Sequence, residues 1–369
     1  MNICIESKLL NHHRRSGLLT YTEGLVNGLS AYDRDNTYSL LYYSLSRPAQ
    51  LMPGPAAPNF TKKVVRVPDR DFFARQWVLD QVALPAFLKN NNIRIFHRPS
   101  GYTMPRVKGV YTVLTVHDLR TLTIGDEFWS QNIGNYQKTI AAVDMCVVVS
   151  ECTKIDMIER LKVPENKIRV IYLGADKRFR KLDAPAVEQV RAKYGLSEPF
   201  LLSIGSVPRK NIDGIIRAFA LSKVHKNVDL VLSCNYHVDE YRQLARELGV
   251  EARIKILSTL SDEDVVALYN GCQAFVFPSL YEGFGLPILE AMQCGAPVIT
   301  SNMSSCPEVA GDAAILVDPK NTGAIAEAMN VITTDDALRR DLIAKGDVQA
   351  RKFDWNIYAR EMKKIYESV

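Results

Sequence analysis

Two glutamates, Glu282 and Glu290, bracket a turn whose chemistry is the most suggestive in this sequence. The turn follows a continuously apolar run at 274–277 and contains Gly285 immediately before Leu286 and Pro287. A strand that ends in such a turn and leads into a helix presents free backbone N–H groups to an anion. Glu282 lies in the loop, where it can face a sugar, and Glu290 lies on the helix, where it can accept hydrogen bonds from ribose hydroxyls. The spacing alone leaves open an ordinary strand–helix turn with two solvated carboxylates.

A basic pair, Arg209 and Lys210, follows the strand predicted at 199–204 and precedes an apolar-striped helix. Arg209 offers a planar fork for phosphate oxygens, and Lys210 offers a compact charge. The alternative interpretation is two basic residues on a solvated loop. This loop and the Glu282 loop both follow strands of the same half of the chain, at the edge where open α/β sheets bind ligands. Their convergence favours one shared anion site.

The first half of the chain carries weaker signals. Gly17 lies between the first predicted strand and a helix, but no GxGxxG pattern surrounds it and no acidic residue is placed for a dinucleotide ribose. A nicotinamide oxidoreductase is therefore disfavoured. His117 follows the strand predicted at 111–116, so its side chain is expected at the carboxyl edge of a sheet. A single histidine in such a place is more often structural than functional.

These residues need two α/β domains to position them. Short β-branched runs alternate with amphipathic segments, which predicts parallel sheets with crossover helices. The expected strands are 2–6, 37–44, 61–67, 93–97, 111–116, 145–149 and 168–173, then 199–204, 228–233, 253–257, 274–278, 297–300 and 313–317. The charged stretch 174–198 interrupts the pattern and is interpreted as a hinge. The last helix has an apolar stripe of Trp355, Tyr358, Met362 and Ile365.

The bulk composition excludes several classes of protein. The chain has 369 residues, enough for two domains, and its net charge of +5 suits phosphate or an anionic surface but is too small to indicate nucleic acid. Seven cysteines without CxxC spacing suggest reduced thiols in a cytoplasmic protein, and six histidines without an HxH or HExxH cluster argue against zinc. No signal peptide and no apolar run of about 20 residues is present, so a soluble or peripheral protein is expected.

Taken together, the motifs resemble retaining glycosyltransferase family 4, which has the GT-B fold, and within it the mannosyltransferase-like branch. Glu282 to Glu290 looks like the E-x7-E motif of that family, and the stretch 301–314 looks like the strand and loop that follow it. Other stretches match in order along nearly the whole chain: 16–22, 96–99, 115–119, 172–176 and 205–211, with Trp77 and Leu84-Pro85. One departure is Glu6-Ser7-Lys8, where the branch usually shows an Asp-Ala-Arg-like run, so the acceptor side matches less well than the donor side.

The resemblance implies an α/β fold with two Rossmann-like doubly wound domains facing a central cleft. It implies an N-terminal acceptor domain at 1–176, a nucleotide-sugar domain at 177–354, and a helix at 355–369 that returns to the first domain. The enzyme would move a hexose, best guess mannose from GDP-mannose, to a glycan or lipid-linked glycan, with retention and without a metal or other cofactor. Arg209, Lys210 and the amides of residues 284–286 would hold the diphosphate. The implied donor-binding residues are Gly17, Gly205, Ser206, Phe284, Gly285, Leu286 and Glu290, and the implied catalytic residues are His117, Arg209, Lys210 and Glu282.

Two other functions remain open at this point. A nucleotide-sugar epimerase would use the same fold and grip the same donor. A catalytically silent nucleotide-sugar-binding subunit is disfavoured, because silent members usually lose the basic pair or a motif glutamate, and all are present here. The run Arg70 to Val78, with Phe72, Phe73 and Arg75, suggests peripheral contact with the inner face of a membrane, whereas Trp77 is expected in the core.

Overall fold

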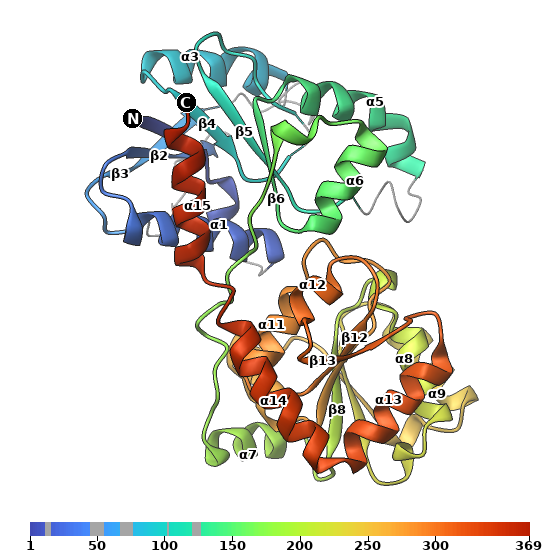
Figure 1. Cartoon of the computed structure of the whole chain (residues 1–369). Coiled ribbons are helices and arrows are strands. Elements are labelled where there is room, and N and C mark those ends of the chain that lie inside the picture. The colour runs from blue at the N-terminus through green and yellow to red at the C-terminus, as the bar shows by residue number, and fades with distance from the viewer. Residues whose placement is uncertain (12–15, 45–54, 67–76, 102, 120–126) are drawn as a thin grey trace. The chain divides into compact units, whose positions relative to one another are not determined.

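The computed structural model describes residues 1–11, 16–44, 55–66, 77–101, 103–119 and 127–369. These residues form two compact units (Figure 1). The first unit combines Met1–Gly174 with Asp354–Val369, and the second consists of Ala175–Phe353. The stretch expected as a hinge contains helix α7 (Ala184–Lys193), which packs against α10 (Asp262–Gly271) inside the second unit.

The first unit is built on a seven-stranded sheet in the order β3-β2-β1-β4-β5-β6-β7, with every neighbouring pair parallel. Its strands are β1 (Asn2–Glu6), β2 (Thr37–Ser44), β3 (Phe60–Arg66), β4 (Ile95–Arg98), β5 (Tyr111–Val116), β6 (Met145–Val148) and β7 (Ile168–Val170). Its helices are α1 (Gly17–Tyr32), α3 (Leu84–Asn90), α5 (Glu127–Ala142), α6 (Glu151–Leu161) and α15 (Trp355–Glu367). Central strands such as β4 are buried along their whole length, as strands covered on both faces must be.

Helix α15, at the C-terminal end of the chain, packs on α1 (Figure 1). Close approach is possible because α1 carries glycine at the contact: a Cβ on Gly24 would lie 2.2 Å from the ring of Trp355. Buried hydrogen bonds also link α15 to the rest of the first unit. The Tyr358 hydroxyl lies 2.7 Å from the Tyr21 hydroxyl, and the Tyr366 hydroxyl lies 2.6 Å from Nδ1 of His97. Apolar burial and satisfied polar groups therefore hold α15 to the first unit.

The second unit has a six-stranded sheet in the order β10-β9-β8-β11-β12-β13, again parallel throughout. The strands are β8 (Phe200–Ile204), β9 (Asp229–Ser233), β10 (Ile254–Leu257), β11 (Ala274–Phe277), β12 (Val298–Ser301) and β13 (Ala314–Val317). In addition to α7 and α10, its helices are α8 (Ile212–Leu221), α9 (Val238–Glu247), α11 (Leu286–Gln293), α12 (Cys306–Ala310), α13 (Thr322–Thr334) and α14 (Asp336–Ala350). The expectation of two doubly wound parallel sheets is confirmed, and each expected strand is present.

Trp77 corrects an expectation from the sequence, because its side chain is 63% exposed rather than in the core. It stands just before a π-helical turn, Leu79–Ala83, which leads directly into α3. A π-helical turn contains one residue more than an α-helical turn. Trp77 therefore does not lie on the same helix face as Leu84 and Leu88, which are fully buried. The arginines and phenylalanines of the expected membrane stretch, residues 70–75, lie outside the described residues.

Candidate functional site

The candidate site of the second unit lies where its strand order reverses. Strands β8 and β11 are neighbours, although the chain leaves β8 toward β9 on one side and reaches β11 on the other. Ligands of doubly wound sheets bind at this switch point, beyond the carboxyl ends of the strands. The loop with Arg209 and Lys210 follows β8, and the turn with Glu282 follows β11. Topology therefore brings the two sequence motifs together.

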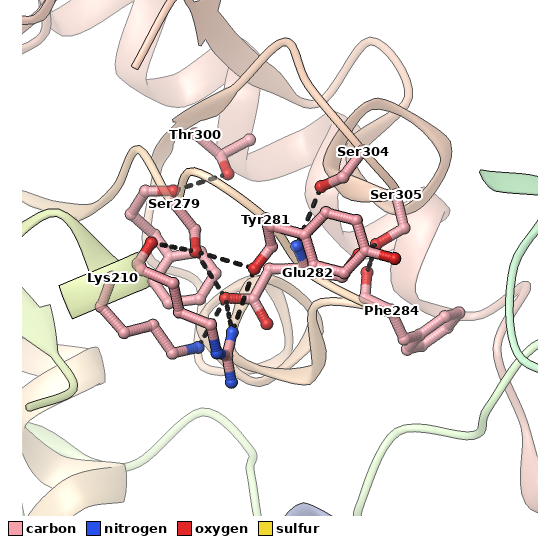
Figure 2. A network of polar contacts seen from close by, with 10 residues as sticks. Lys210, Ser279, Tyr281, Glu282, Phe284, Thr300, Ser304 and Ser305 are labelled. Atoms are coloured by element: carbon pink, nitrogen blue, oxygen red, sulfur yellow. Dashed lines mark hydrogen bonds and ion pairs between the residues drawn. The ribbon is translucent and has the colours of Figure 1, made fainter. Parts of the chain in front are cut away.

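Arg209, Lys210 and Glu282 meet at a single carboxylate oxygen. Figure 2 shows Lys210 and Glu282 at this contact. Oε1 of Glu282 accepts hydrogen bonds from Nη1 of Arg209 at 2.6 Å and from Nζ of Lys210 at 2.7 Å. The hydroxyl of Ser279 donates a third at 2.6 Å. The carboxylate is almost fully buried, with Glu282 6% exposed. Glu282 is therefore the internal counter-ion of the basic pair, which the sequence did not indicate.

The charges at this centre are strongly coupled. Burial would raise the pKa of Glu282, but the charges of Lys210 and Arg209 and the hydrogen bonds from Lys210 and Ser279 outweigh it, so the pKa is lowered. The pKa of Lys210 is lowered mainly by burial, with Arg209 adding to the effect and Glu282 opposing it. The ammonium also lies 4.2 Å from the centroid of the Phe277 ring. The carboxylate is ionised at neutral pH and balances one of two adjacent cations, which leaves a local positive charge.

Hydrogen bonds tie the two loops into one unit. The amide of Leu280 donates to the carbonyl of Arg209 at 2.8 Å, and the hydroxyl oxygen of Ser279 lies 2.9 Å from the same carbonyl oxygen. Asn211, in the left-handed region with a φ of 61°, donates from Nδ2 to the carbonyls of Pro278 and Pro319. The basic pair is therefore held in place before any ligand arrives. Ser279 and Asn211 could be recognised only once the topology had made the loops neighbours.

Gly205 and Ser206 shape the loop ahead of the basic pair. Gly205 has a φ of +139°, and a Cβ there would lie 2.6 Å from Cγ of Lys210, so only glycine lets the lysine stem cross the backbone. The hydroxyl of Ser206 accepts a hydrogen bond of 2.7 Å from the amide of Asn235, which links this loop to the one after β9. Gly205 and Ser206 therefore set the conformation of this loop and carry none of its charge.

The turn after Glu282 leads into the N-terminus of α11. Gly285 is the residue before the helix, with a φ of +107°, and Leu286 and Pro287 begin its first turn. Phe284 is buried and packs edge-on against Phe353, with ring centroids 5.8 Å apart. The amide groups of this turn lie at the positive end of the helix, which suits an anion.

A second loop, which follows β12, is hydrogen-bonded to this turn through Ser304 and Ser305 (Figure 2). The amide of Glu282 donates to the hydroxyl of Ser304 at 3.0 Å. The hydroxyl of Ser305 lies 2.9 Å from the carbonyl oxygen of Glu282 and 2.8 Å from that of Phe284. Ser304 has a φ of 53°, in the left-handed region. These serines belong to the stretch 301–314. The resemblance to the family was the only signal in the sequence that pointed to this stretch.

Glu290 lies on α11, one turn after Leu286, and its side chain is partly buried. Oε2 accepts a hydrogen bond of 3.3 Å from the hydroxyl of the buried Tyr269. Burial raises the pKa of Glu290 to about 7, and the charge of Asp176 adds to the shift, against the hydrogen bond from Tyr269. The carboxylate is therefore poised between its two protonation states near neutral pH, unlike that of Glu282.

The first unit contains the remaining two predicted residues. Gly17 is the first residue of α1, and the hydroxyl of the preceding Ser16 accepts a hydrogen bond from the amide of Leu19. A Cβ on Gly17 would meet no other atom within 4 Å. Nε2 of His117 lies 2.8 Å from the carbonyl oxygen of Pro99, so this nitrogen carries the proton and Nδ1 remains an acceptor. Burial lowers the pKa of His117 and keeps the ring neutral. Its ring meets that of Tyr21 edge-on, with centroids 4.5 Å apart.

Glu6, in the stretch that differs from the family's usual Asp-Ala-Arg-like run, belongs to a buried ion-pair cluster in the first unit. Arg98, 1% exposed, lies with Nε 3.3 Å from Oε2 of Glu6 and Nη2 2.9 Å from Oδ1 of Asp80. The hydroxyl of Tyr43 donates to Oε1 of Glu6 at 2.8 Å. The Glu6 carboxylate is thus bound by Arg98 and Tyr43.

In the part of the chain that the structure describes, no three His, Cys, Asp or Glu side chains gather as metal ligands, and no helix is long and apolar enough to span a membrane.

Two family models match the chain. "Glycosyltransferase Family 4" matches residues 16–179, and "Glycosyl transferases group 1" matches residues 187–349. The chain is 32% identical to O-antigen chain mannosyltransferase B of Escherichia coli over 71% of each protein. It is 33% identical to the serotype-specific mannosyltransferase WbdA of Escherichia coli over 66% of this chain but only 32% of that longer protein.

Solved structures share the architecture over the whole chain. Sucrose-phosphate synthase from Thermosynechococcus elongatus superposes with a TM-score of 0.79 at 20% identity, covering 100% of this chain and 98% of that one. HepE of Anabaena, solved with UDP-glucose, superposes with a TM-score of 0.76 at 16% identity and covers 100% of both chains. These likenesses establish the GT-B fold.

Proposed function

This chain belongs to glycosyltransferase family 4, and we propose that it transfers a hexose with retention of configuration, without a metal, to a glycan or lipid-linked glycan. GDP-mannose is the donor we favour, because the relatives O-antigen chain mannosyltransferase B and WbdA are named as mannosyltransferases. The acceptor class follows from the same names, since an O-antigen chain is a growing polysaccharide.

The observation that carries the proposal is the meeting of Arg209 and Lys210 with the Glu282 turn at the N-terminus of α11. A nucleotide sugar reacts by releasing a diphosphate, whose negative charge grows as the glycosidic bond breaks. Fixed cations and helix amides at that position stabilise the transition state more than the ground state, which is the usual source of a large rate enhancement. We assign the diphosphate to the basic pair and to the amides of Phe284, Gly285 and Leu286.

The remaining groups of the donor are assigned to three side chains. Glu290 would accept hydrogen bonds from the ribose hydroxyls. Glu282 and His117 would bind hydroxyl groups of the transferred sugar, Glu282 as a carboxylate and His117 through Nδ1 as a neutral acceptor. Gly17, Gly205 and Ser206 would be further donor-binding residues.

Retention is proposed through front-face displacement. In that reaction the acceptor hydroxyl attacks the face from which the diphosphate departs, and a donor phosphate oxygen takes the hydroxyl proton. No carboxylate nucleophile is then needed, unlike in a retaining glycosidase. The basic pair and the helix N-terminus supply the counter-charge that Mg²⁺ supplies in other transferases.

A donor panel in excess EDTA tests the proposal. GDP-mannose, UDP-glucose, UDP-galactose, UDP-N-acetylglucosamine and GDP-fucose would be scored by slow hydrolysis and thermal shift. We expect turnover with GDP-mannose in EDTA, and NMR of the product should show the donor's α-configuration. Turnover that stops on chelation and returns with a divalent metal would overturn metal independence. Release of a free epimer of the donor without acceptor would identify an epimerase instead.

The assignment of Glu290 has its own test. Glu290→Gln should preserve the fold and weaken the binding of GDP by about 1–3 kcal/mol, the scale of a charge-assisted hydrogen bond. Calorimetry measures this directly, with Glu240→Gln on the surface of the same unit as the matched control. An unchanged affinity for GDP would mean that Glu290 does not contact the nucleotide.

We further propose that the protein works in the cytoplasm and touches the inner face of the membrane only peripherally, through the stretch that includes Arg70, Phe72, Phe73 and Arg75. Each basic residue near an anionic surface contributes about 1 kcal/mol, so a soluble fraction should coexist with the bound one. Flotation with anionic and neutral liposomes at low salt tests this. Binding that Phe72→Ser with Arg75→Ser leaves unchanged would place the membrane contact elsewhere.

A further inference from the structure

The serine pair Ser304–Ser305 has no role in the reaction described so far, although it is bonded directly to the turn that carries Glu282. Ser305 is completely buried, and its hydroxyl lies within hydrogen-bond distance of two carbonyl oxygens of the turn, at 2.9 and 2.8 Å. The hydroxyl of Ser304 accepts from the amide of Glu282. All three contacts fall on backbone groups between Glu282 and Phe284 (Figure 2).

These contacts fix the direction of the peptide groups in the turn. In a planar trans peptide the carbonyl and the N–H of the next residue point in opposite directions. Because the carbonyl of Phe284 points at Ser305, the N–H of Gly285 must point away from it. The same relation directs the amide of Gly283 through the carbonyl of Glu282. Ser305 thus orients amides of the turn, whereas Ser304 holds the backbone from which the Glu282 side chain reaches Lys210.

Two further observations show that the serine loop is itself rigid. The amide of Met303 donates to the hydroxyl of Ser301 at 3.0 Å, and Ser301 is fully buried at the end of β12. Ser304 occupies the left-handed region, with a φ of 53°, where a residue other than glycine is strained. Backbone strain of this kind persists only where the surroundings enforce it. The loop that contains Ser304 and Ser305 is therefore held in one conformation by its own contacts.

We propose that Ser304 and Ser305 are positioning residues for the transfer reaction, which orient the Glu282–Gly285 turn for the donor's diphosphate. The inference rests on the proposed function, in which this turn binds that diphosphate. A displaced turn would misplace both the amide of Gly285 and the carboxylate of Glu282. Misplacement of catalytic groups by about 1 Å can cost about a hundredfold in rate.

The test compares two variants with a matched control. Ser305→Ala removes the buried hydroxyl, and Ser304→Gly removes a hydroxyl while relieving the left-handed strain. Ser222→Ala is the control, because Ser222 is 1% exposed in the same unit and its hydroxyl donates to the carbonyl of Phe219 at 2.6 Å. Ser222 follows α8, before β9 begins, and so lies at the opposite edge of the sheet from the turn.

Three quantities would be measured: the affinity for GDP and UDP by calorimetry, kcat for transfer, and stability in denaturant. We expect kcat to fall by roughly tenfold to a hundredfold in Ser305→Ala and Ser304→Gly. Affinity for the preferred diphosphate should fall severalfold, and the control should keep both values. Ser304→Gly should lose activity without losing stability, a combination that a purely structural serine would not give.

Ser305→Ala with wild-type kcat and affinity, but with the same loss of stability as Ser222→Ala, would overturn the positioning role. Wild-type protein that binds neither GDP nor UDP would overturn the proposed function first, and the inference with it. Wild-type protein that binds a diphosphate but transfers no sugar would overturn the transfer reaction alone, and the affinities would still decide the role of the serines.

Discussion

Individual carboxylates of this site are set to different protonation states by their neighbours. Burial raises the pKa of Glu290 to about 7; the charge of Asp176 adds to the rise, and the hydrogen bond from Tyr269 opposes it. A raised carboxyl pKa means that the native state binds a proton more tightly than the unfolded chain does. Stability from this group is therefore complete below the unfolded pKa of about 4.5 and is lost as pH rises through about 7.

The consequence can be measured by denaturant unfolding of wild type and Glu290→Gln between pH 4.5 and 8. The glutamine cannot ionise, so the variant should gain stability relative to wild type across this window. The relative gain should be on the order of 3 kcal/mol, given a pKa that rises from 4.5 to about 7 and about 1.36 kcal/mol per pKa unit. Parallel stability curves for the two proteins would show that the pKa of Glu290 is not raised.

Glu282 supports a prediction of opposite character, because its carboxylate is the counter-ion of the two basic side chains to which we assign the donor's diphosphate. Removing its charge by Glu282→Gln should raise the affinity for GDP severalfold, since the diphosphate then has no competing carboxylate beside Arg209 and Lys210. The same change should lower kcat, because the proposed contact between the Glu282 carboxylate and the sugar is lost. Calorimetry and steady-state kinetics test the two effects separately. A weakened affinity would instead assign Glu282 the role of ordering the basic pair for the ligand.

At the scale of elements, α15 is held to the first unit by side chains that a sequence pattern identifies only in part. Its apolar stripe is visible in the sequence, but the polar chain through Tyr358, Tyr21 and Thr115 appears only in the fold. Tyr358→Phe leaves the Tyr21 hydroxyl with one partner fewer in a buried place. We expect a loss of about 1–2 kcal/mol in unfolding free energy. Tyr236→Phe, which removes a hydroxyl from a side chain that is 62% exposed, is the control and should change nothing. Equal stability of Tyr358→Phe and wild type would show that packing alone holds the helix.

At the scale of the whole molecule, the strands and the two loops that contain Arg209 and Glu282 could be predicted because their signals are local. Apolar runs mark buried strands, and glycine or basic residues directly after a strand mark its loop. Ser279, Ser304 and Tyr269 could not be predicted, because their contacts depend on which strands become neighbours. Trp77 was predicted wrongly because a π-helical turn shifts the phase of the helix, and no residue pattern announces that shift.

The central claim is that Arg209 and Lys210 hold a donor diphosphate without a metal. Calorimetric titration of GDP into wild type, Arg209→Ala and Lys210→Ala, all in excess EDTA, tests it most directly. Arg242→Ala, which changes an exposed arginine of the same unit, is the control. We predict that wild type and the control bind GDP in EDTA, and that each site variant loses at least tenfold in affinity. Binding by wild type that requires a divalent metal, or equal affinities in all four proteins, would contradict the account.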